Sequence, residues 1–175
     1  MNPSGFHVAL IEPEIPQNTG NIGRTCVATG SRLHLVAPLG FSLEDKHMKR
    51  AGLDYWPDLS WELHPGRDAF FASCPGGRFV LTRSRGGTSL YDHRFEPGDV
   101  LVFGRESVGL PAQVFQEVTG PQITIPMTGP TRSLNIANSV AIVLFEALRQ
   151  LHVRGFPVFA GAQAVPAVPR GAVTA

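Results

Sequence analysis

The sequence has few of the features that mark metal centres, membrane proteins or secreted proteins. It contains only two cysteines, Cys26 and Cys74, and neither forms a Cys-x-x-Cys pair or lies near paired histidines. We therefore expect no structural zinc site, and reduced thiols in a cytoplasmic protein. The longest apolar run is interrupted by Glu146, well short of the ~20 residues of a membrane span. The start of the chain lacks the basic and apolar regions of a secretory signal, so no membrane association is expected.

Charge is also scarce. Only 17% of the 175 residues are charged and the net charge is +1, below the ~25% charged residues usual in soluble domains. This balance excludes an acidic or polybasic disordered protein. It also suggests that another subunit covers part of the surface. The hydrophobic share of 43% is enough for one well-packed domain of this length.

The common nucleotide-binding and hydrolase fingerprints are missing. The sequence has no Gly-x-Gly-x-x-Gly after its first apolar run, no P-loop motif and no Gly-x-Ser-x-Gly. Dinucleotide-binding, P-loop and hydrolase functions are therefore unsupported. A cofactor held by the main chain of glycine-rich loops remains open, because glycine lets the backbone approach a ligand closely.

Apolar runs alternate with helical patterns along the chain. Buried strands are predicted at residues 7–11, 33–37, 79–82, 100–103 and 123–125. Helices are predicted at 24–29 (after a polar loop over 16–23 and with Thr19 or Asn21 as its cap), 44–52, 111–118 and 133–152. This alternation predicts an α/β fold, a mostly parallel sheet with helices on both faces. We expect one domain over residues 1–154. Residues 155–175, rich in Ala, Gly, Pro and Val, are expected to form a mobile tail or a loosely docked strap.

Four loops of unusual composition follow predicted strands. They cover residues 16–24, 82–87, 104–111 and 126–135. Ligands of open α/β sheets bind beyond the carboxyl ends of the strands. These loops are therefore the expected place of a binding site.

The loops carry a resemblance to a known superfamily. The segments are EPEIPQNTGNIGRT, DYW after KRAGL, FGRESVGLP and IPMTGPTRSLNIANSVAIVLFEALRQL. From about His7 to Leu151 the chain resembles the SPOUT methyltransferases. Within them it is similar to the small family that methylates the ribose 2′-oxygen of the wobble nucleotide of tRNA, cytidine or uridine. The resemblance implies a C-terminal trefoil knot, S-adenosyl-L-methionine as methyl donor without a metal, a homodimer completed through the last helix, and leucine tRNAs as substrates.

The resemblance also assigns cofactor-binding positions. Main-chain groups at Leu81, Gly104, Ile125 and Ser133 are expected to contact S-adenosyl-L-methionine, with Met127 and Leu134 as apolar walls. Strand ends that lack pairing partners leave N–H and C=O groups free for such contacts. The residues alone allow other interpretations: Leu81 and Ile125 as strand core, Gly104 as a turn residue and Ser133 as the cap of the last helix.

Three side chains are implied in catalysis. Arg24 is expected beside the acceptor ribose, where its permanently charged guanidinium suits phosphate anchoring and alkoxide stabilisation better than proton abstraction. The alternative is a solvated helix arginine. Glu106 could accept hydrogen bonds from Arg24 or from neighbouring N–H groups, or could be a helix N-terminal charge. Asn135 could orient the substrate or the cofactor carboxylate.

A basic cluster is the candidate RNA contact. Lys46, Lys49 and Arg50 share one face of the predicted helix over 44–52, which suits tRNA phosphates, although a solvated charged face is the simpler interpretation. Two departures from the family pattern, Val108 and Phe145, leave the RNA target and the dimer contact open. The competing functions are 2′-O-methylation at another tRNA or rRNA site and non-catalytic RNA binding by the same fold.

Overall fold

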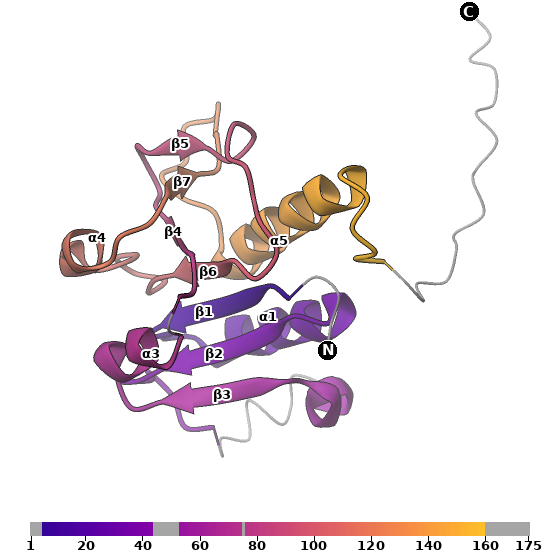
Figure 1. Cartoon of the computed structure of the whole chain (residues 1–175). Coiled ribbons are helices and arrows are strands. Elements are labelled where there is room, and N and C mark those ends of the chain that lie inside the picture. The colour runs from indigo at the N-terminus through magenta and orange to yellow at the C-terminus, as the bar shows by residue number, and fades with distance from the viewer. Residues whose placement is uncertain (1–4, 44–52, 75, 160–175) are drawn as a thin grey trace, which may run out of the picture.

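The protein is built on a seven-stranded sheet with the strand order β3-β2-β1-β6-β4-β7-β5 (Figure 1). The computed structural model describes residues 5–43, 53–74 and 76–159. All six pairings between these strands are parallel. The strands are β1 (His7–Ile11), β2 (Arg32–Val36), β3 (Trp61–His64), β4 (Phe79–Thr82), β5 (Thr88–Ser89), β6 (Val100–Phe103) and β7 (Gln122–Thr124).

Helices cover both faces of this sheet. They are α1 (Pro16–Thr29), the 3-10 helix η1 (Leu53–Asp58), α3 (Arg67–Ser73), α4 (Ala112–Glu117) and α5 (Ile136–Val153). Ile22 of α1 and Leu144 of α5 belong to one buried cluster, on one face of the sheet. Phe70 of α3 and Val114 of α4 belong to the other. The predicted α/β architecture, a mostly parallel sheet with helices on both faces, is confirmed.

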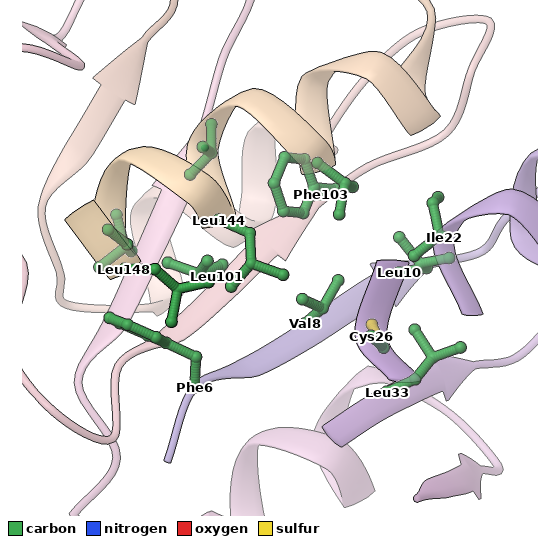
Figure 2. Packing of buried hydrophobic residues seen from close by; sticks show 14 of the residues in the cluster. Phe6, Val8, Leu10, Ile22, Cys26, Leu33, Leu101, Phe103, Leu144 and Leu148 are labelled. Carbon is green, nitrogen blue, oxygen red and sulfur yellow. The ribbon is translucent and has the colours of Figure 1, made fainter. Parts of the chain in front are cut away.

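Strand residues alternate between the two cores, as the period of two along a strand requires. Val8 and Leu10 of β1 face α1 and α5, whereas Ala9 and Ile11 face α3 and α4, and all four are fully buried. Strands buried on both faces are typical of parallel sheets covered by helices. Figure 2 shows the first core, where Val8, Leu10, Ile22, Cys26, Leu33, Leu101, Phe103, Leu144 and Leu148 meet.

The polar loop predicted over residues 16–23 is wrong, because these residues are the first turns of α1. The helix begins with Pro16 at its first position, where a missing N–H costs nothing. The two glycines that suggested a loop instead lie on the side of α1 that η1 contacts. Gly20 accepts a hydrogen bond from Tyr55 at 2.5 Å, and a Cβ on Gly23 would lie 3.2 Å from the Trp56 and Leu59 side chains. The predicted end is confirmed: Gly30, at φ 63°, terminates α1.

Helix α5 begins later than predicted, at Ile136. Asn135 is its cap and accepts a hydrogen bond from the Ala137 N–H at 2.9 Å, so the expectation that Ser133 caps this helix is wrong. Among the helices of the described residues, only α5 is long and apolar enough to cross a membrane. Seven of its residues are buried, which is typical of a core helix.

Several elements have no clear sequence signal. Strand β3 reads Trp-Glu-Leu-His, without the continuous apolar run of the central strands, and β5 has only two residues. The predicted helix over 44–52, with Lys46, Lys49 and Arg50, lies outside the described residues. Of the predicted tail, the described portion is docked, because Phe156 and Val158 pack on the core of α1 and α5.

Candidate functional site

A cavity of about 810 Å³ opens at the carboxyl ends of β4, β6 and β7. Three of the predicted loops converge on it, contributing residues 82–85, 104–110 and 132–135 among others. These segments are far apart in the sequence, and the parallel sheet brings them to one edge. The expectation of a shared hollow between these loops is confirmed.

Most of the predicted cofactor residues line this cavity. They are Gly104, Ile125, Met127, Ser133 and Leu134. Leu81 is not among the lining residues. It is fully buried in the core beside α3 and α4, and its N–H is already donated to the Pro121 carbonyl at 2.8 Å. The side chain of Leu81 is thus strand core, and the next residue, Thr82, is the first of this strand to reach the cavity.

Gly104 is required by close backbone contact. A Cβ at this position would lie 2.1 Å from the Gly109 carbonyl carbon and the Leu110 nitrogen. The loop is closed by two reciprocal hydrogen bonds, from Arg105 N–H to Gly109 at 3.1 Å and from Gly109 N–H to Arg105 at 2.9 Å. Gly104 therefore fixes the shape of a loop that forms one wall of the cavity.

The Glu106 carboxylate holds the N-terminus of α1. It accepts hydrogen bonds from Glu14 N–H at 2.8 Å, Ile15 N–H at 3.2 Å and Asn18 Nδ2 at 3.1 Å. The capping residue Ile15 has no side chain that could satisfy these donors, so Glu106 supplies the cap from a distant loop. The interpretation of Glu106 as an acceptor of N–H groups and a helix N-terminal charge is thus confirmed, although the helix is α1 and not the following one.

Reciprocal contacts complete a carboxylate clasp, which we define as Glu12, Glu14, Glu106, Arg105 and Ser107. Glu14 accepts from Ser107 N–H at 2.9 Å and from its hydroxyl at 2.8 Å, and Arg105 forms an ion pair with Glu12. The clasp joins the loops after β1 and β6, neighbouring strands from which the chain leaves in opposite directions. Such a switch point is the usual ligand crevice of open α/β sheets. Here the clasp ties the two loops together, and the cavity extends along β4, β6 and β7.

Asn18 connects the clasp to α5, and the sequence analysis missed it as a site residue. Its Nδ2 donates to Glu106, and its Oδ1 accepts from Asn135 Nδ2 at 3.0 Å. Asn18 is 7% exposed and lines the cavity. Glu106, Asn18 and Asn135 are therefore one hydrogen-bonded chain in which Asn135 both caps α5 and faces the cavity. Only the place of Asn18 in the first resembling segment pointed to it.

The cavity carries arginines on several of its walls. Arg83 donates to Gln122 Oε1 at 2.6 Å and stacks on Phe115 at 4.9 Å, and Arg105 is paired in the clasp. Arg85 and Arg132 also line the cavity, and within the described part of the chain neither forms an ion pair. This arrangement favours ligands that carry carboxylate or phosphate groups.

Arg24 lies apart from the cavity lining. It is exposed on α1, and its guanidinium stacks 4.8 Å from the centre of the Tyr55 ring. Helix α1 packs beside α5, whose outer face exposes Ile142 (37%) and Phe145 (50%). The predicted arginine and this apolar face therefore lie on neighbouring helices.

The thiols have no features of a metal or catalytic site. Cys26 and Cys74 are both free. Cys26 is fully buried on the inner face of α1, and burial raises the pKa of its thiol to about 12, so it stays protonated at neutral pH.

Comparison with known proteins identifies the family of this chain. The model of the SpoU rRNA Methylase family matches residues 5–145. A tRNA (cytidine(34)-2′-O)-methyltransferase of Burkholderia ambifaria is 48% identical over 154 residues, 86% of this chain and 98% of the relative.

The fold is also similar to those of solved methyltransferase structures. A structure described as giving structural insights into the 2-OH methylation of C/U34 on tRNA is 49% identical and has a TM-score of 0.83. The match covers 87% of this chain and 100% of that one. An AdoMet-bound rRNA methyltransferase from Sinorhizobium meliloti is 27% identical with a TM-score of 0.76, over 86% of this chain and 59% of that one.

Proposed function

Because the chain belongs to the SpoU rRNA Methylase family, we propose that it methylates the ribose 2′-oxygen of the wobble nucleotide of tRNA. The observation that carries this proposal is the 48% identity to a tRNA (cytidine(34)-2′-O)-methyltransferase over 98% of that protein. The enzyme is a methyltransferase that acts on cytidine or uridine at position 34, with leucine tRNAs as the expected substrates. We expect the enzyme to act in the cytoplasm.

The cavity fits S-adenosyl-L-methionine. Ile125, Met127 and Leu134 offer apolar surface to its adenine, while Gly104 lets the main chain come close. Arg132 offers a partner for its carboxylate. When bound, the donor supplies a methyl group that is already electrophilic on a sulfonium, so the transfer calls for no metal. The resemblance predicts that the C-terminal loops form a trefoil knot, and we include this knot in the proposal.

Arg24 is assigned to the acceptor ribose. Its guanidinium stays charged at any physiological pH, so it anchors the adjoining phosphate and stabilises the developing 2′-alkoxide. The Tyr55 ring restricts the guanidinium by stacking. Proximity and charge stabilisation, and not proton abstraction by this residue, are its contribution.

A homodimer completes the site in this proposal. Arg24 does not line the cavity of its own chain, so a second copy is the natural source of the arginine. Ile142 and Phe145 on α5 give the apolar contact surface, and α1 lies beside them. Pairing along these helices brings Arg24 of one protomer toward the cavity of the other.

Arg24→Ala tests the assignment. We expect methylation of tRNA in a single turnover to slow by about 100-fold or more, in the range found for loss of one charge-stabilising donor, while calorimetry shows S-adenosyl-L-methionine affinity within about twofold of the wild type. Arg94→Ala, at an exposed arginine paired with Glu96, is the matched control and should methylate normally.

The outcomes separate the alternatives. Nucleoside mass spectrometry of total tRNA after incubation with labelled donor should find 2′-O-methylcytidine or 2′-O-methyluridine at position 34. A near-normal rate for Arg24→Ala would refute its role. Label on ribosomal RNA or at another tRNA position would overturn the substrate, and failure to bind the donor would indicate a non-catalytic RNA-binding protein.

A further inference from the structure

Three histidines form a diagonal row across neighbouring strands, away from the cavity. His7 of β1, His34 of β2 and His64 of β3 lie on the sheet face covered by α3, and Figure 1 shows these strands side by side. His7 Nδ1 is 2.8 Å from His34 Nε2, and His34 Nδ1 is 2.9 Å from His64 Nε2. His34 and His64 are each only 3% exposed.

Both ring nitrogens of His34 are therefore engaged. A neutral imidazole carries one proton, so His34 donates to one neighbour and accepts from the other. Burial, with the neighbouring histidines and Arg32, lowers the pKa of His34 to about 3. Neutral imidazole is the form of histidine that ligates metal ions.

Glu62 adds a carboxylate to this pair. It lies directly opposite His34 in the strand register and two residues before His64, on the same face of β3. The ligand atoms of His34, Glu62 and His64 all lie within 4.8 Å of one another. Glu62 is partly solvent-exposed, with 44% of its side chain accessible, so an ion can enter from its side.

We propose that His34, His64 and Glu62 form a site for a divalent transition-metal ion of the Zn²⁺ type. Zinc prefers histidine nitrogen and carboxylate oxygen, and three protein ligands leave a fourth position for water. The ion takes the place of the hydrogen bond between His34 Nδ1 and His64 Nε2. The proton of that bond moves, by exchange with solvent, to the other nitrogen of its own ring, so both imidazoles stay neutral and no net proton is released. Two Zn–N bonds of about 2.1 Å at a tetrahedral angle place the nitrogens ~3.4 Å apart, so the two nitrogens separate by about half an ångström from their present 2.9 Å.

The remaining neighbours have defined roles in this site. With Nδ1 on the metal, His34 donates its Nε2–H to His7, an outer hydrogen bond that fixes the tautomer and orientation of a ligand. Arg32 opposes metal binding, because it holds Glu62 Oε2 at 2.8 Å. The site is therefore in competition with an ion pair, and the strength of that pair sets its affinity.

The metal would hold the edge of the sheet. β3 is an outer strand whose only strand neighbour within the described sheet is β2. Because the ligands come from both strands, the ion would link β2 and β3 in addition to the main-chain pairing over four residues. This role concerns stability and is separate from methyl transfer, since the cavity lies along β4, β6 and β7.

The test is a titration of the full-length, untagged, chelator-treated protein with Co²⁺, a spectroscopic substitute for Zn²⁺. We expect the visible absorption bands of tetrahedral Co²⁺ to saturate at one ion per chain and to disappear when Zn²⁺ is added. Glu62→Gln should weaken binding by at least tenfold. Arg32→Gln should strengthen it, because the competing ion pair is gone. At one Zn²⁺ concentration, the rise in Tm should be larger for the wild type than for Glu62→Gln.

Glu117→Gln, at an exposed carboxylate on α4, is the control and should bind Co²⁺ like the wild type. Unchanged circular dichroism of the Glu62→Gln and Arg32→Gln proteins separates loss of ligand from loss of fold, since both residues are on the surface. Absence of tetrahedral bands in the wild type, or bands that Glu62→Gln leaves intact, would overturn the proposal. Methylation activity does not enter either outcome, so this test is independent of the proposed function.

Discussion

The two halves of the sheet differ in how completely their strands pair. In the three-strand half, β1 pairs with β2 over five residues and β2 with β3 over four. In the four-strand half, β4 pairs with β7 over only two residues, and so does β5 with β7. Full pairing uses up main-chain hydrogen-bonding groups, whereas short strands end in loops whose groups remain free for a ligand. The cavity lies on the poorly paired side.

The well-paired half positions a loop that forms one wall of the cavity in the other half. The loop after β6 has one side in the carboxylate clasp and the other side in the cavity wall. Its position is therefore set by the well-paired half, through Glu14 and α1. A binding loop positioned by rigid elements loses little conformational freedom when a ligand arrives.

Gly104→Ala should have the largest effect, because it changes the shape of the loop that forms one wall of the cavity. The added methyl would lie 2.1 Å from the Gly109 and Leu110 backbone, which cannot move without opening the loop. We expect S-adenosyl-L-methionine affinity, measured by calorimetry, to fall by about 100-fold or more, ~3 kcal/mol. Gly129→Ala is the control, because a Cβ there meets nothing within 4 Å. Equal affinities of the two variants would show that the loop shape is unimportant.

Glu106→Ala should remove the hydrogen bonds that tie the loop after β6 to the N-terminus of α1. It leaves three N–H donors of the α1 start without their acceptor, and because part of this region is open to water we expect a loss of about 1–2 kcal/mol in the free energy of unfolding. Urea denaturation measures this loss. Glu106→Gln, which keeps one acceptor oxygen, should fall between the two, and Glu117→Ala should match the wild type. A stability equal to that of the wild type would mean that water replaces the carboxylate fully.

Arg85→Ala should have the smallest effect, and it tests whether the cavity rim contacts RNA. Arg85 lines the cavity without an ion pair among the described residues, so it is available for an RNA phosphate. We expect a three- to fivefold loss in tRNA affinity and a salt dependence reduced by about one counterion. Filter binding at several salt concentrations measures both, with Arg94→Ala as the control. An unchanged salt slope would place the phosphate path elsewhere.

The sequence predicted the central strands and the cavity loops well for physical reasons. Runs such as Val100–Phe103 are buried on both faces and so contain no polar residue that would hide them. The loop after β6 could be placed because Gly104 follows such a strand directly and Gly109 comes five residues later.

The remaining features depend on contacts between distant segments. The helix over Pro16–Thr29 contains Gly20 and Gly23, which favour a loop locally, and the close packing of Trp56 and Leu59 against Gly23 cannot be seen in the sequence. The clasp needs Glu106 to lie beside Glu14, although they are 92 residues apart. The histidine row likewise arises from the register of three strands, and no spacing along the chain reveals it.

The lengths of the outermost strands have a consequence for self-association. An exposed strand edge can recruit another chain and seed aggregates when it is long, flat and apolar. Here β3 has four residues with a charged Glu62, and β5 has only two. Neither therefore offers a long apolar template for edge-to-edge growth.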